Sequence, residues 1–271
     1  MNTVRTFRKM KESGEKIVML TAYDYPSARF TEAAGVDIIL VGDSLGMVIL
    51  GYQDTLPVTM EDVLYHTRAT RRGAPNTFIA ADMPFLSYHI NPDETKKNAA
   101  RFIVEGGANA VKLEGGIPSR IEAIRAIRDC EIPVVAHLGL TPQSIHAIGG
   151  YAIQGKTKAD FDLLKEQALA VQQAGAFLLV LEGIPEKLGK EITESLTIPT
   201  IGIGAGRYTD GQVLVYHDIL GMSEIEPRFL KVYVRLSQII TGSIKDYYDD
   251  VKQGRFPAEE HIYKPIKPDE K

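Results

Sequence analysis

The sequence predicts an α/β fold, a (β/α)8 or TIM barrel that forms one domain over residues 1–271. The main observation is a repeat in which short apolar runs alternate with segments whose apolar residues recur every three or four positions. The apolar runs are nearly continuous, as is typical of parallel strands that helices cover on the outer face. The chain length is also ordinary for a single barrel. Eight such alternations favour a closed barrel over an open sheet.

The eight expected strands are rich in valine, isoleucine and leucine. They cover residues 17–24, 37–44, 77–85, 109–116, 132–139, 177–183, 198–206 and 211–218. The last has the weakest pattern, because its residues could also begin a loop. Clear helical spacing occurs in four intervening segments, at residues 26–36, 91–108, 120–130 and 158–176. A glycine stands near the end of three of them, which is typical of a helix that ends before a strand.

Three segments lie outside this repeat. Residues 2–12 predict a short helix that would cover the barrel floor, the end at which the strands begin. Residues 228–250 predict a C-terminal helix, and residues 251–271 form a polar tail. The glycine-rich segment 140–158 is a long connection, and we expect it to act as a lid, because such loops in compact domains are usually functional or disordered.

Composition excludes several classes of protein. The 31 basic and 35 acidic residues give a net charge of −4 without a basic cluster, so neither nucleic acid nor a membrane is an expected partner. Cys130 is the only cysteine, which excludes an intrachain disulfide and favours a reducing compartment; we expect it to pack rather than react. No apolar run approaches the roughly 20 residues that span a bilayer. We therefore expect a cytoplasmic protein.

Charged side chains follow six apolar runs, at the points where the first six expected strands end. These residues are Asp24, Asp43, Asp82, Glu114, His137 and Glu182. In a barrel the strand ends share one face, called the mouth below, and active sites are found there. Crowded carboxylates repel one another and resist burial, and a bound cation relieves that repulsion. The pattern therefore indicates a metal site.

The oxygen-rich set without cysteine suits Mg²⁺ or another hard divalent cation. Asp43 and Asp82 are the expected direct ligands. Glu114 is either a third ligand or an acceptor for metal-bound water. For Asp43 alone, capping of the following helix explains the residue equally well, but capping does not explain the whole set.

Lys112, His137 and Glu182 complete the candidate site. Lys112 lies two residues before Glu114, so both side chains point into the barrel. It could pair with Glu114, form a Schiff base or bind a substrate carboxylate; we favour the carboxylate, because a metal and a Schiff base are redundant electrophiles. His137 is either a polar core residue or a hydrogen-bonding partner of the substrate. Leucine and valine flank Glu182, and an apolar setting makes a carboxylate more basic, as a general base requires.

Long segments of the chain also resemble the ketopantoate hydroxymethyltransferase family. The resemblance runs from about residue 3 to about residue 261 and includes VGDSLGMV, AADMPFLSY, VKLEGG, VVAHLGLTPQS, LVLEGIP and GRFPAEEH. VGDSLGMV and VKLEGG in this order are quite specific. The resemblance implies transfer of a hydroxymethyl group from 5,10-methylenetetrahydrofolate to 3-methyl-2-oxobutanoate, which yields 2-dehydropantoate (ketopantoate) for pantothenate and coenzyme A synthesis.

The resemblance also implies residue roles. Mg²⁺ would bind Asp43 and Asp82, with Glu114 beside it, and Glu182 would accept a proton. Substrate contacts are implied for Asp43, Ser44, Asp82 and Lys112. The chemistry expected from the residues agrees, because a metal can stabilise the enolate of a 2-oxo acid before it attacks the one-carbon donor. The family further implies a homo-oligomer, a decamer.

Two alternatives remain at this point. One is a lyase or mutase of the phosphoenolpyruvate mutase and isocitrate lyase type, which shares the barrel and the AYD and GDS segments. Lyases of that type resemble a scheme with a catalytic cysteine in a strand-end loop, and this sequence has no such cysteine. The other is an inactive barrel that serves in assembly or binding. The presence of every strand-end carboxylate argues against that alternative.

Overall fold

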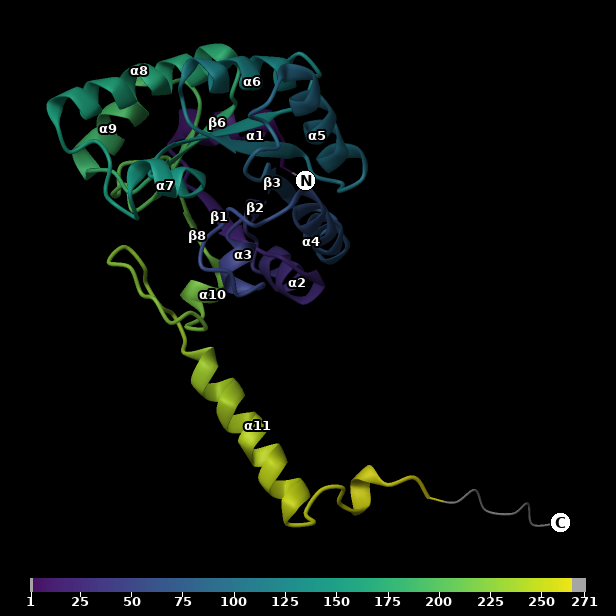
Figure 1. The fold of residues 1–271 in the computed structure, drawn as a ribbon. Coiled ribbons are helices and arrows are strands. Elements are labelled where there is room, and N and C mark those ends of the chain that lie inside the picture. Colours follow the sequence, from purple (N-terminus) through teal and green to yellow (C-terminus); the bar gives the residue numbers. More distant parts are fainter. Residues whose placement is uncertain (1, 265–271) are drawn as a thin grey trace. The chain divides into compact units, whose positions relative to one another are not determined.

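In the computed structural model, which describes residues 2–264, eight parallel strands close into a barrel (Figure 1). The strands follow one another around the ring in sequence order, and β8 pairs with β1 to close it. Their bounds are β1 (Ile17–Thr21), β2 (Ile38–Val41), β3 (Phe78–Asp82), β4 (Ala110–Glu114), β5 (Val134–Gly139), β6 (Leu178–Glu182), β7 (Thr200–Ile203) and β8 (Gly211–Leu214). The predicted (β/α)8 barrel is confirmed.

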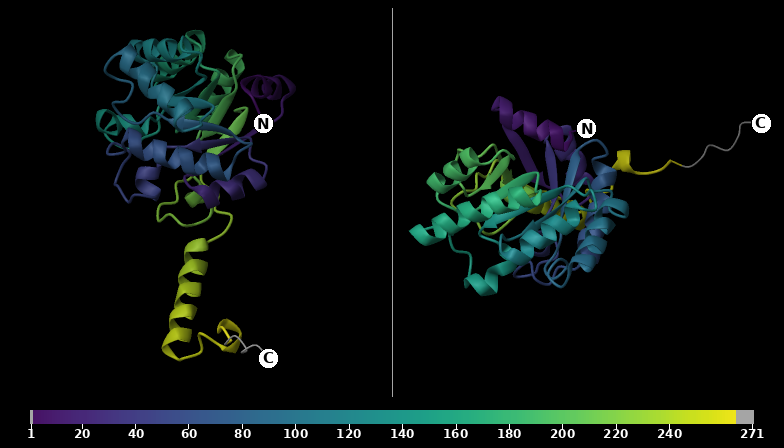
Figure 2. Two further views of the ribbon diagram at one scale, coloured as in Figure 1. Left: turned by 90° about the vertical axis from the view of Figure 1, so that its right-hand side faces the viewer. Right: turned by 90° about the horizontal axis from the view of Figure 1, so that it is seen from above.

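Helices lie outside the strands, as two further views show (Figure 2). The four helices expected from apolar spacing are α2 (Tyr25–Ala33), α5 (Pro92–Val104), α6 (Pro118–Arg128) and α8 (Lys158–Ala174). The spacing had not singled out α4 (Met60–Gly73) or α9 (Glu186–Ser195). Shorter elements are α3 (Leu45–Val48), η1 (Pro142–Ser144), α7 (Ile145–Ile148), α10 (Tyr216–Ile219) and η2 (Glu259–His261). The expected alternation fails once, because residues 204–210 join β7 to β8 without a helix.

Local sequence sets where most of the long helices begin. Short polar side chains at the N-cap accept a hydrogen bond from a backbone N–H of the first turn, which otherwise has no partner. The residues that do so are Thr3, Asp24, Thr59, Asn91 and Thr157. At the other end of α8, Gly175 adopts a φ of 110°, a left-handed conformation that ends the helix.

The apolar core has two layers that follow from the alternation of side chains along each strand. One layer fills the barrel interior, and the other packs between the strands and the surrounding helices. Helix α1 (Val4–Ser13) closes the interior layer from below, where the Phe7 ring packs edge-on against Phe78 at 5.1 Å between centroids. The predicted helix over residues 2–12 is therefore present and covers the floor.

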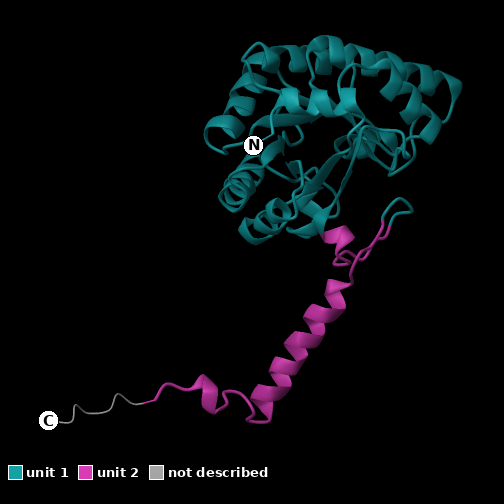
Figure 3. Cartoon of the chain, turned by 180° about the vertical axis from the view of Figure 1, so that it is seen from behind, with its two compact units in different colours: residues 1–216, 227–230 teal, residues 217–226, 231–271 magenta. Residues whose placement is uncertain are grey.

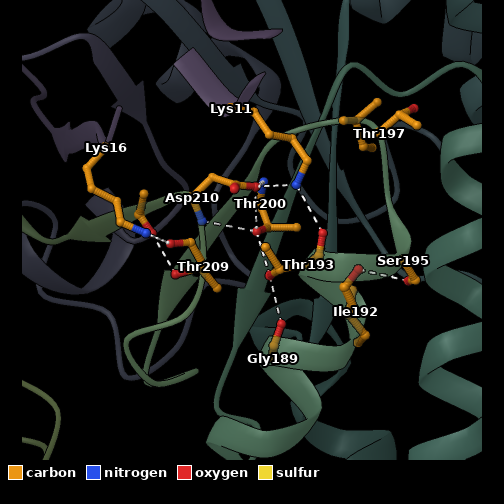
Figure 4. A network of polar contacts seen from close by, with 12 residues as sticks. Lys11, Lys16, Gly189, Ile192, Thr193, Ser195, Thr197, Thr200, Thr209 and Asp210 are labelled. Carbon is orange, nitrogen blue, oxygen red and sulfur yellow. Dashed lines mark hydrogen bonds and ion pairs between the residues drawn. The ribbon is translucent and has the colours of Figure 1, made fainter. Parts of the chain in front are cut away.

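A hydrogen-bonded network ties α1 to the floor (Figure 4). Lys11 Nζ lies 2.7 Å from Asp210 Oδ2 and also donates to the Thr193 carbonyl oxygen at 3.0 Å. The same Asp210 oxygen accepts from the Thr200 backbone N at 2.8 Å and the Thr200 hydroxyl at 3.0 Å. One carboxylate, one ammonium group and two further donors thus satisfy each other.

The chain divides into two compact units (Figure 3). The barrel with residues 227–230 forms the first, and residues 217–226 form the second together with the described residues from 231 to 264. The second contains α11 (Leu236–Lys252), so the C-terminal helix expected at 228–250 begins eight residues later than predicted. No residue of α11 is buried. The end of the predicted tail, residues 265–271, lies outside the described residues, and among those described no helix is long and apolar enough to cross a membrane.

Candidate active site

Strand register brings the predicted residues together at the mouth. Asp82 on β3 is the register partner of Lys112 on β4, and Glu114 on β4 is the partner of His137 on β5. Glu182 ends the next strand, β6, where it is the register partner of Gly139, two positions beyond His137. Each residue sits at or near the carboxyl end of its strand, so neighbouring strands deliver these charged groups to one place.

Asp24 is the exception among the six strand-end residues. Its side chain caps α2 and accepts hydrogen bonds from the Ser27 backbone N at 2.8 Å and the Ser27 hydroxyl at 2.5 Å. The residue is exposed. The expectation that Asp24 belongs to the crowd of acids was wrong, because its sequence position serves the helix that follows.

Lys112 is the cation at the centre of the site. Its Nζ lies 2.6 Å from Asp82 Oδ1 and 3.6 Å from Glu114 Oε1, and the residue is 4% exposed. Burial alone lowers the pKa of Lys112, but the charges of Asp82, Glu114 and Asp43 outweigh burial and raise it above the ordinary value. A lysine that stays protonated is a poor nucleophile, and this disfavours a Schiff base. Asp82, rather than the expected Glu114, is its nearest partner.

His137 lies between two carboxylates. Nδ1 is 3.3 Å from Glu114 Oε1, and Nε2 is 3.3 Å from Glu182 Oε2; these are ion pairs whose angles are not those of hydrogen bonds. Burial and Lys112 lower the pKa of His137, yet the two carboxylates dominate and raise it to about 9. The ring is therefore charged at neutral pH and holds both carboxylates, while its contact with a substrate stays a prediction.

The leucines that flank Glu182 in the sequence do not surround its carboxylate in the structure. Leu179 and Leu181 pack into the layer beneath the helices, whereas Glu182 faces the mouth, where its nearest charged group is His137. Its side chain keeps 17% exposure. Glu182 is thus accessible from the mouth, as a proton acceptor must be, but a histidine rather than leucine lies against its carboxylate.

The carboxylate of Asp43 is buried close to other acidic side chains. Its backbone N donates to Asp82 Oδ2 at 3.0 Å, and both residues are buried. Burial, followed by repulsion from Asp82 and Glu114, raises the pKa of Asp43 well above its usual range. The alternative that Asp43 caps a helix is not what the structure shows, since α3 has Ser44 as its N-cap and no side-chain capping bond. Asp43 instead presents its carboxylate to the site.

Sequence reasoning missed three polar residues of the site. The Gln143 amide donates to Asp43 Oδ2 at 2.8 Å, and the Tyr88 hydroxyl donates to Gln143 Oε1 at 2.5 Å. The Tyr23 hydroxyl lies 2.8 Å from the Ser44 hydroxyl, the predicted substrate contact. None of the three carries a charge, so the search for strand-end acids passed over them, although Tyr88 and Gln143 stand in the segments AADMPFLSY and VVAHLGLTPQS that carry the family resemblance.

A cavity of ≈220 Å³ adjoins the acids. Glu114 forms part of its wall, together with residues of the segments after β3, β4 and β5 and two residues of α8. Arg120 lines it too, with its guanidinium group 5.3 Å from the centre of the Tyr88 ring. A second hollow, of ≈260 Å³, is lined by residues of α8, α9 and the segment before α8, and it does not include the acids. The cavity beside Glu114 is the one next to the reactive groups.

The donor set of the site is all oxygen, which suits a hard divalent cation. Among residues 2–264, no group of three or more histidine, cysteine, aspartate or glutamate side chains is placed to hold a metal ion. Glu114 faces Lys112 and His137, and it accepts from the Gln143 backbone N at 3.1 Å. Asp43 and Asp82 therefore suit the role of direct ligands better than Asp43, Asp82 and Glu114 together do. Glu114 suits the role of an acceptor for metal-bound water.

Cys130 is exposed and follows α6, ahead of β5. The expectation that it packs was wrong. Because it precedes the strand, it lies on the floor side of the barrel and away from the strand-end loops. Cys130 is therefore not placed as the catalytic cysteine of the alternative lyase scheme.

Comparison with known proteins extends over almost the whole chain. Residues 1–259 match the family model described as ketopantoate hydroxymethyltransferase. The 3-methyl-2-oxobutanoate hydroxymethyltransferase of Syntrophotalea carbinolica is 56% identical over 96% of this chain and 98% of its own length. The protein of that name from Bacillus subtilis is 54% identical over 97% of this chain and 95% of its own.

Solved structures of other enzymes share the fold at low identity. A phosphoenolpyruvate phosphomutase from Streptomyces platensis is 17% identical, with a TM-score of 0.64 over 97% of this chain and 92% of its own. A phosphonopyruvate hydrolase bound to oxalate and Mg²⁺ is 14% identical, with a TM-score of 0.63 over 97% and 94% of the two chains. At such identities the likeness concerns the barrel alone.

Proposed function

This chain belongs to the ketopantoate hydroxymethyltransferase family, and we propose that it holds its oxo acid at a divalent cation bound by Asp43 and Asp82. The reaction of the family is hydroxymethyl transfer to 3-methyl-2-oxobutanoate, a step of pantothenate synthesis, and the product is 2-dehydropantoate. One observation carries the proposed site: a buried Lys112–Asp82 pair beside a second buried aspartate, Asp43, whose charge Lys112 and Gln143 offset only in part.

The cation we propose is Mg²⁺, although the residues would also accept another hard divalent ion. When bound, it supplies Lewis-acid stabilisation of the negative charge that develops on the keto oxygen of the substrate. Lys112 remains charged and attracts the substrate carboxylate, while Ser44 and Asp82 border the same space. These residues orient the oxo acid so that its C3 faces the open part of the mouth.

Glu182 is the residue we assign as proton acceptor. It removes the proton from C3 of the oxo acid, and C3 forms its new bond to the one-carbon unit. One water supplies the hydroxyl oxygen and gives its two protons to the folate nitrogens, whose bonds to that carbon break so that tetrahydrofolate leaves, and the new alkoxide takes up a proton. His137 keeps the Glu182 carboxylate in place through the 3.3 Å contact of its Nε2. Since Glu182 is partly exposed, it can release the proton to solvent after turnover.

The one-carbon donor, 5,10-methylenetetrahydrofolate, we place in the cavity beside Glu114. Its ≈220 Å³ is smaller than a typical ligand pocket of about 300–1,000 Å³, so it suits the ring end of the donor rather than the whole molecule. Arg120 offers a guanidinium group to the carbonyl group of that ring. The segment after β5, residues 140–158, borders this cavity and as a lid would keep bulk water from the donor while admitting the one water that the reaction consumes.

Partners and location follow from the same family. Exposed apolar residues on α11 include Ile239, Ile240, Ile244 and Val251, and an uncovered surface of this kind favours self-association. We propose a homo-oligomer, a decamer as the family implies, located in the cytoplasm. Light scattering on the purified protein measures the assembly size directly, and a monomer would contradict this part.

Proton exchange at C3 tests the proposal without folate. The enzyme is incubated in D₂O with 3-methyl-2-oxobutanoate, with and without Mg²⁺, and loss of the C3 proton is followed by NMR. We expect exchange that requires the metal and disappears in Asp43→Asn. Borohydride treatment of the same mixture should leave no adduct on the protein. Metal-independent exchange, or a reduced adduct on Lys112, would overturn the proposed mechanism.

A further inference from the structure

The segment after β5 reaches into the acid cluster through one uncharged residue, Gln143. Its backbone N donates to Glu114 Oε2 at 3.1 Å, and its side-chain Nε2 donates to Asp43 Oδ2 at 2.8 Å. Gln143 is 4% exposed. A single residue of this segment therefore contacts two of the three carboxylates for which a metal role was predicted.

The amide of Gln143 has a partner for each of its polar groups. Besides Asp43, Nε2 donates to the Met83 carbonyl oxygen at 3.0 Å, and Oε1 accepts from the Tyr88 hydroxyl at 2.5 Å. These partners set which end of the amide faces Asp43, since a flipped amide would oppose oxygen to oxygen. The Tyr88 hydroxyl in turn accepts from the Glu114 backbone N at 3.2 Å. Tyr88 and Gln143 thus form a bridge between β4 and Asp43.

Beyond Gln143, the segment has few contacts. Gly149 and Gly150 have positive φ angles, and a Cβ atom at either position would meet no other atom within 4 Å, while Tyr151 and Ile153 are exposed. The chain is fastened again where the Gln154 backbone N donates to the Gly183 carbonyl oxygen at 2.9 Å. Gln143 is therefore the anchor at one end of a loosely packed loop.

We propose that Gln143 is a positioning residue that couples cation binding at Asp43 to the order of residues 144–153. The inference rests on the proposed metal site. The Gln143 amide donates to the same Asp43 carboxylate that would bind the cation, so a cation that fixes this carboxylate also fixes the amide and the start of the loop that follows it. By linkage, the protein binds the cation more tightly when this loop is anchored than when the loop is loose. The Tyr88 hydroxyl holds the amide in the orientation that this coupling needs.

The test compares Gln143→Leu with Gln154→Leu. Leucine approximates the size of glutamine but donates nothing to Asp43, and Gln154 is a matched control in the same loop whose side chain donates only to the Ala152 carbonyl oxygen. Mg²⁺ affinity is measured by calorimetry, and hydrogen exchange of residues 144–153 is measured with and without Mg²⁺. Neither readout depends on turnover.

We expect Gln143→Leu to bind Mg²⁺ about 10- to 100-fold more weakly, the usual loss when a residue that orients a metal ligand is removed. Mg²⁺ should slow exchange of residues 144–153 in the native enzyme and in Gln154→Leu, but not in Gln143→Leu. Tyr88→Phe removes one hydroxyl and should weaken Mg²⁺ binding in the same direction by a smaller factor, which keeps the test open if Gln143→Leu folds poorly.

Asp43→Asn separates this inference from the metal proposal. If Asp43→Asn abolishes Mg²⁺ binding while Gln143→Leu and Tyr88→Phe bind as the native enzyme does, the coupling is overturned and the metal site stands. If the native enzyme does not bind Mg²⁺, or if Asp43→Asn binds it as well as the native enzyme does, the metal site itself is overturned, and the coupling with it.

Discussion

The mouth and the floor of the barrel each contain a lysine–aspartate pair, and the two pairs are built differently. On the floor, Lys11 and Asp210 are 2.7 Å apart and about 15% exposed, and Thr200 supplies two further donors to the same carboxylate oxygen. At the mouth, Lys112 and Asp82 are 2.6 Å apart and nearly inaccessible, and two more carboxylates crowd the one lysine.

The surroundings of each pair indicate what it does. On the floor the donors match the acceptors, and the network fastens a helix to two strands, which is a stabilising role. At the mouth burial raises the pKa of Asp82 and Lys112 only partly offsets it, while Asp43 has no lysine of its own. An arrangement that leaves acids under-compensated is costly unless a ligand completes it. Its presence favours the proposed binding site over a purely stabilising contact.

The largest expected effect is at Asp43. Asp43→Asn removes a candidate metal ligand, and activity should fall by a factor on the order of 10²–10³, the scale of a lost transition-state electrostatic contact. The melting temperature in metal-free buffer should stay the same or rise, because one repelling charge is gone. Turnover and thermal melting are measured on the same preparation. Normal turnover at ordinary Mg²⁺ would remove Asp43 from the site.

Asp82 should behave differently from Asp43 in stability. Asp82→Asn also abolishes activity, but it leaves buried Lys112 with a weaker partner, so the melting temperature should drop. The contrast between the two variants is read from melting curves in metal-free buffer. Equal melting temperatures would show that the Lys112–Asp82 pair gives no net stabilisation.

Glu182→Gln keeps the shape of the side chain and removes its basicity. We expect turnover to fall about 10²- to 10⁴-fold, the usual contribution of a general base, with little change in Mg²⁺ affinity. Deuterium exchange at C3 and transfer of the one-carbon unit are followed separately. If the variant exchanges the C3 proton at the native rate but fails to transfer the one-carbon unit, Glu182 acts in the folate half of the reaction. If exchange and transfer both proceed at native rates, Glu182 has only a structural role.

On the floor, Asp210→Ala should act on stability instead of chemistry. It leaves Lys11 and the Thr200 donors without their acceptor, and we expect the free energy of unfolding to fall by about 2–4 kcal/mol. This is slightly less than the loss expected for a fully buried pair, because the site is partly exposed. Denaturant unfolding measures the loss. The turnover number per folded molecule should change less than twofold, and a large drop would contradict the assignment of the floor to stability.

The smallest effect concerns the cavity beside Glu114. Arg120→Ala should raise the KM for 5,10-methylenetetrahydrofolate about tenfold, the scale of one lost charged hydrogen bond, and leave C3 exchange unchanged. Arg125→Ala, on the exposed face of the same helix, is the control and should alter neither quantity. An equal loss of exchange and transfer in Arg120→Ala would mean that Arg120 supports Tyr88 rather than the donor.

The sequence by itself determined the eight strands, although five of the expected runs continue three or four residues past the end of the observed strand. Continuous apolar runs mark strands that are buried on both faces, and the charged residues at the ends of these runs pointed to Asp43, Asp82, Glu114, His137 and Glu182, which the structure brings together at the mouth. Family likeness then supplied the reaction. These features are local or repetitive, which is why a single sequence carries them.

Only the tertiary structure decided which strand-end residues meet and what they touch. Register paired Lys112 with Asp82, helix capping turned Asp24 away from the site, and a loop carried Gln143 to Asp43 across 100 positions of sequence. Lateral strand pairing and loop conformation depend on the whole barrel closing, and an uncharged glutamine leaves no pattern along the chain. Contacts between residues distant in sequence therefore required the folded molecule.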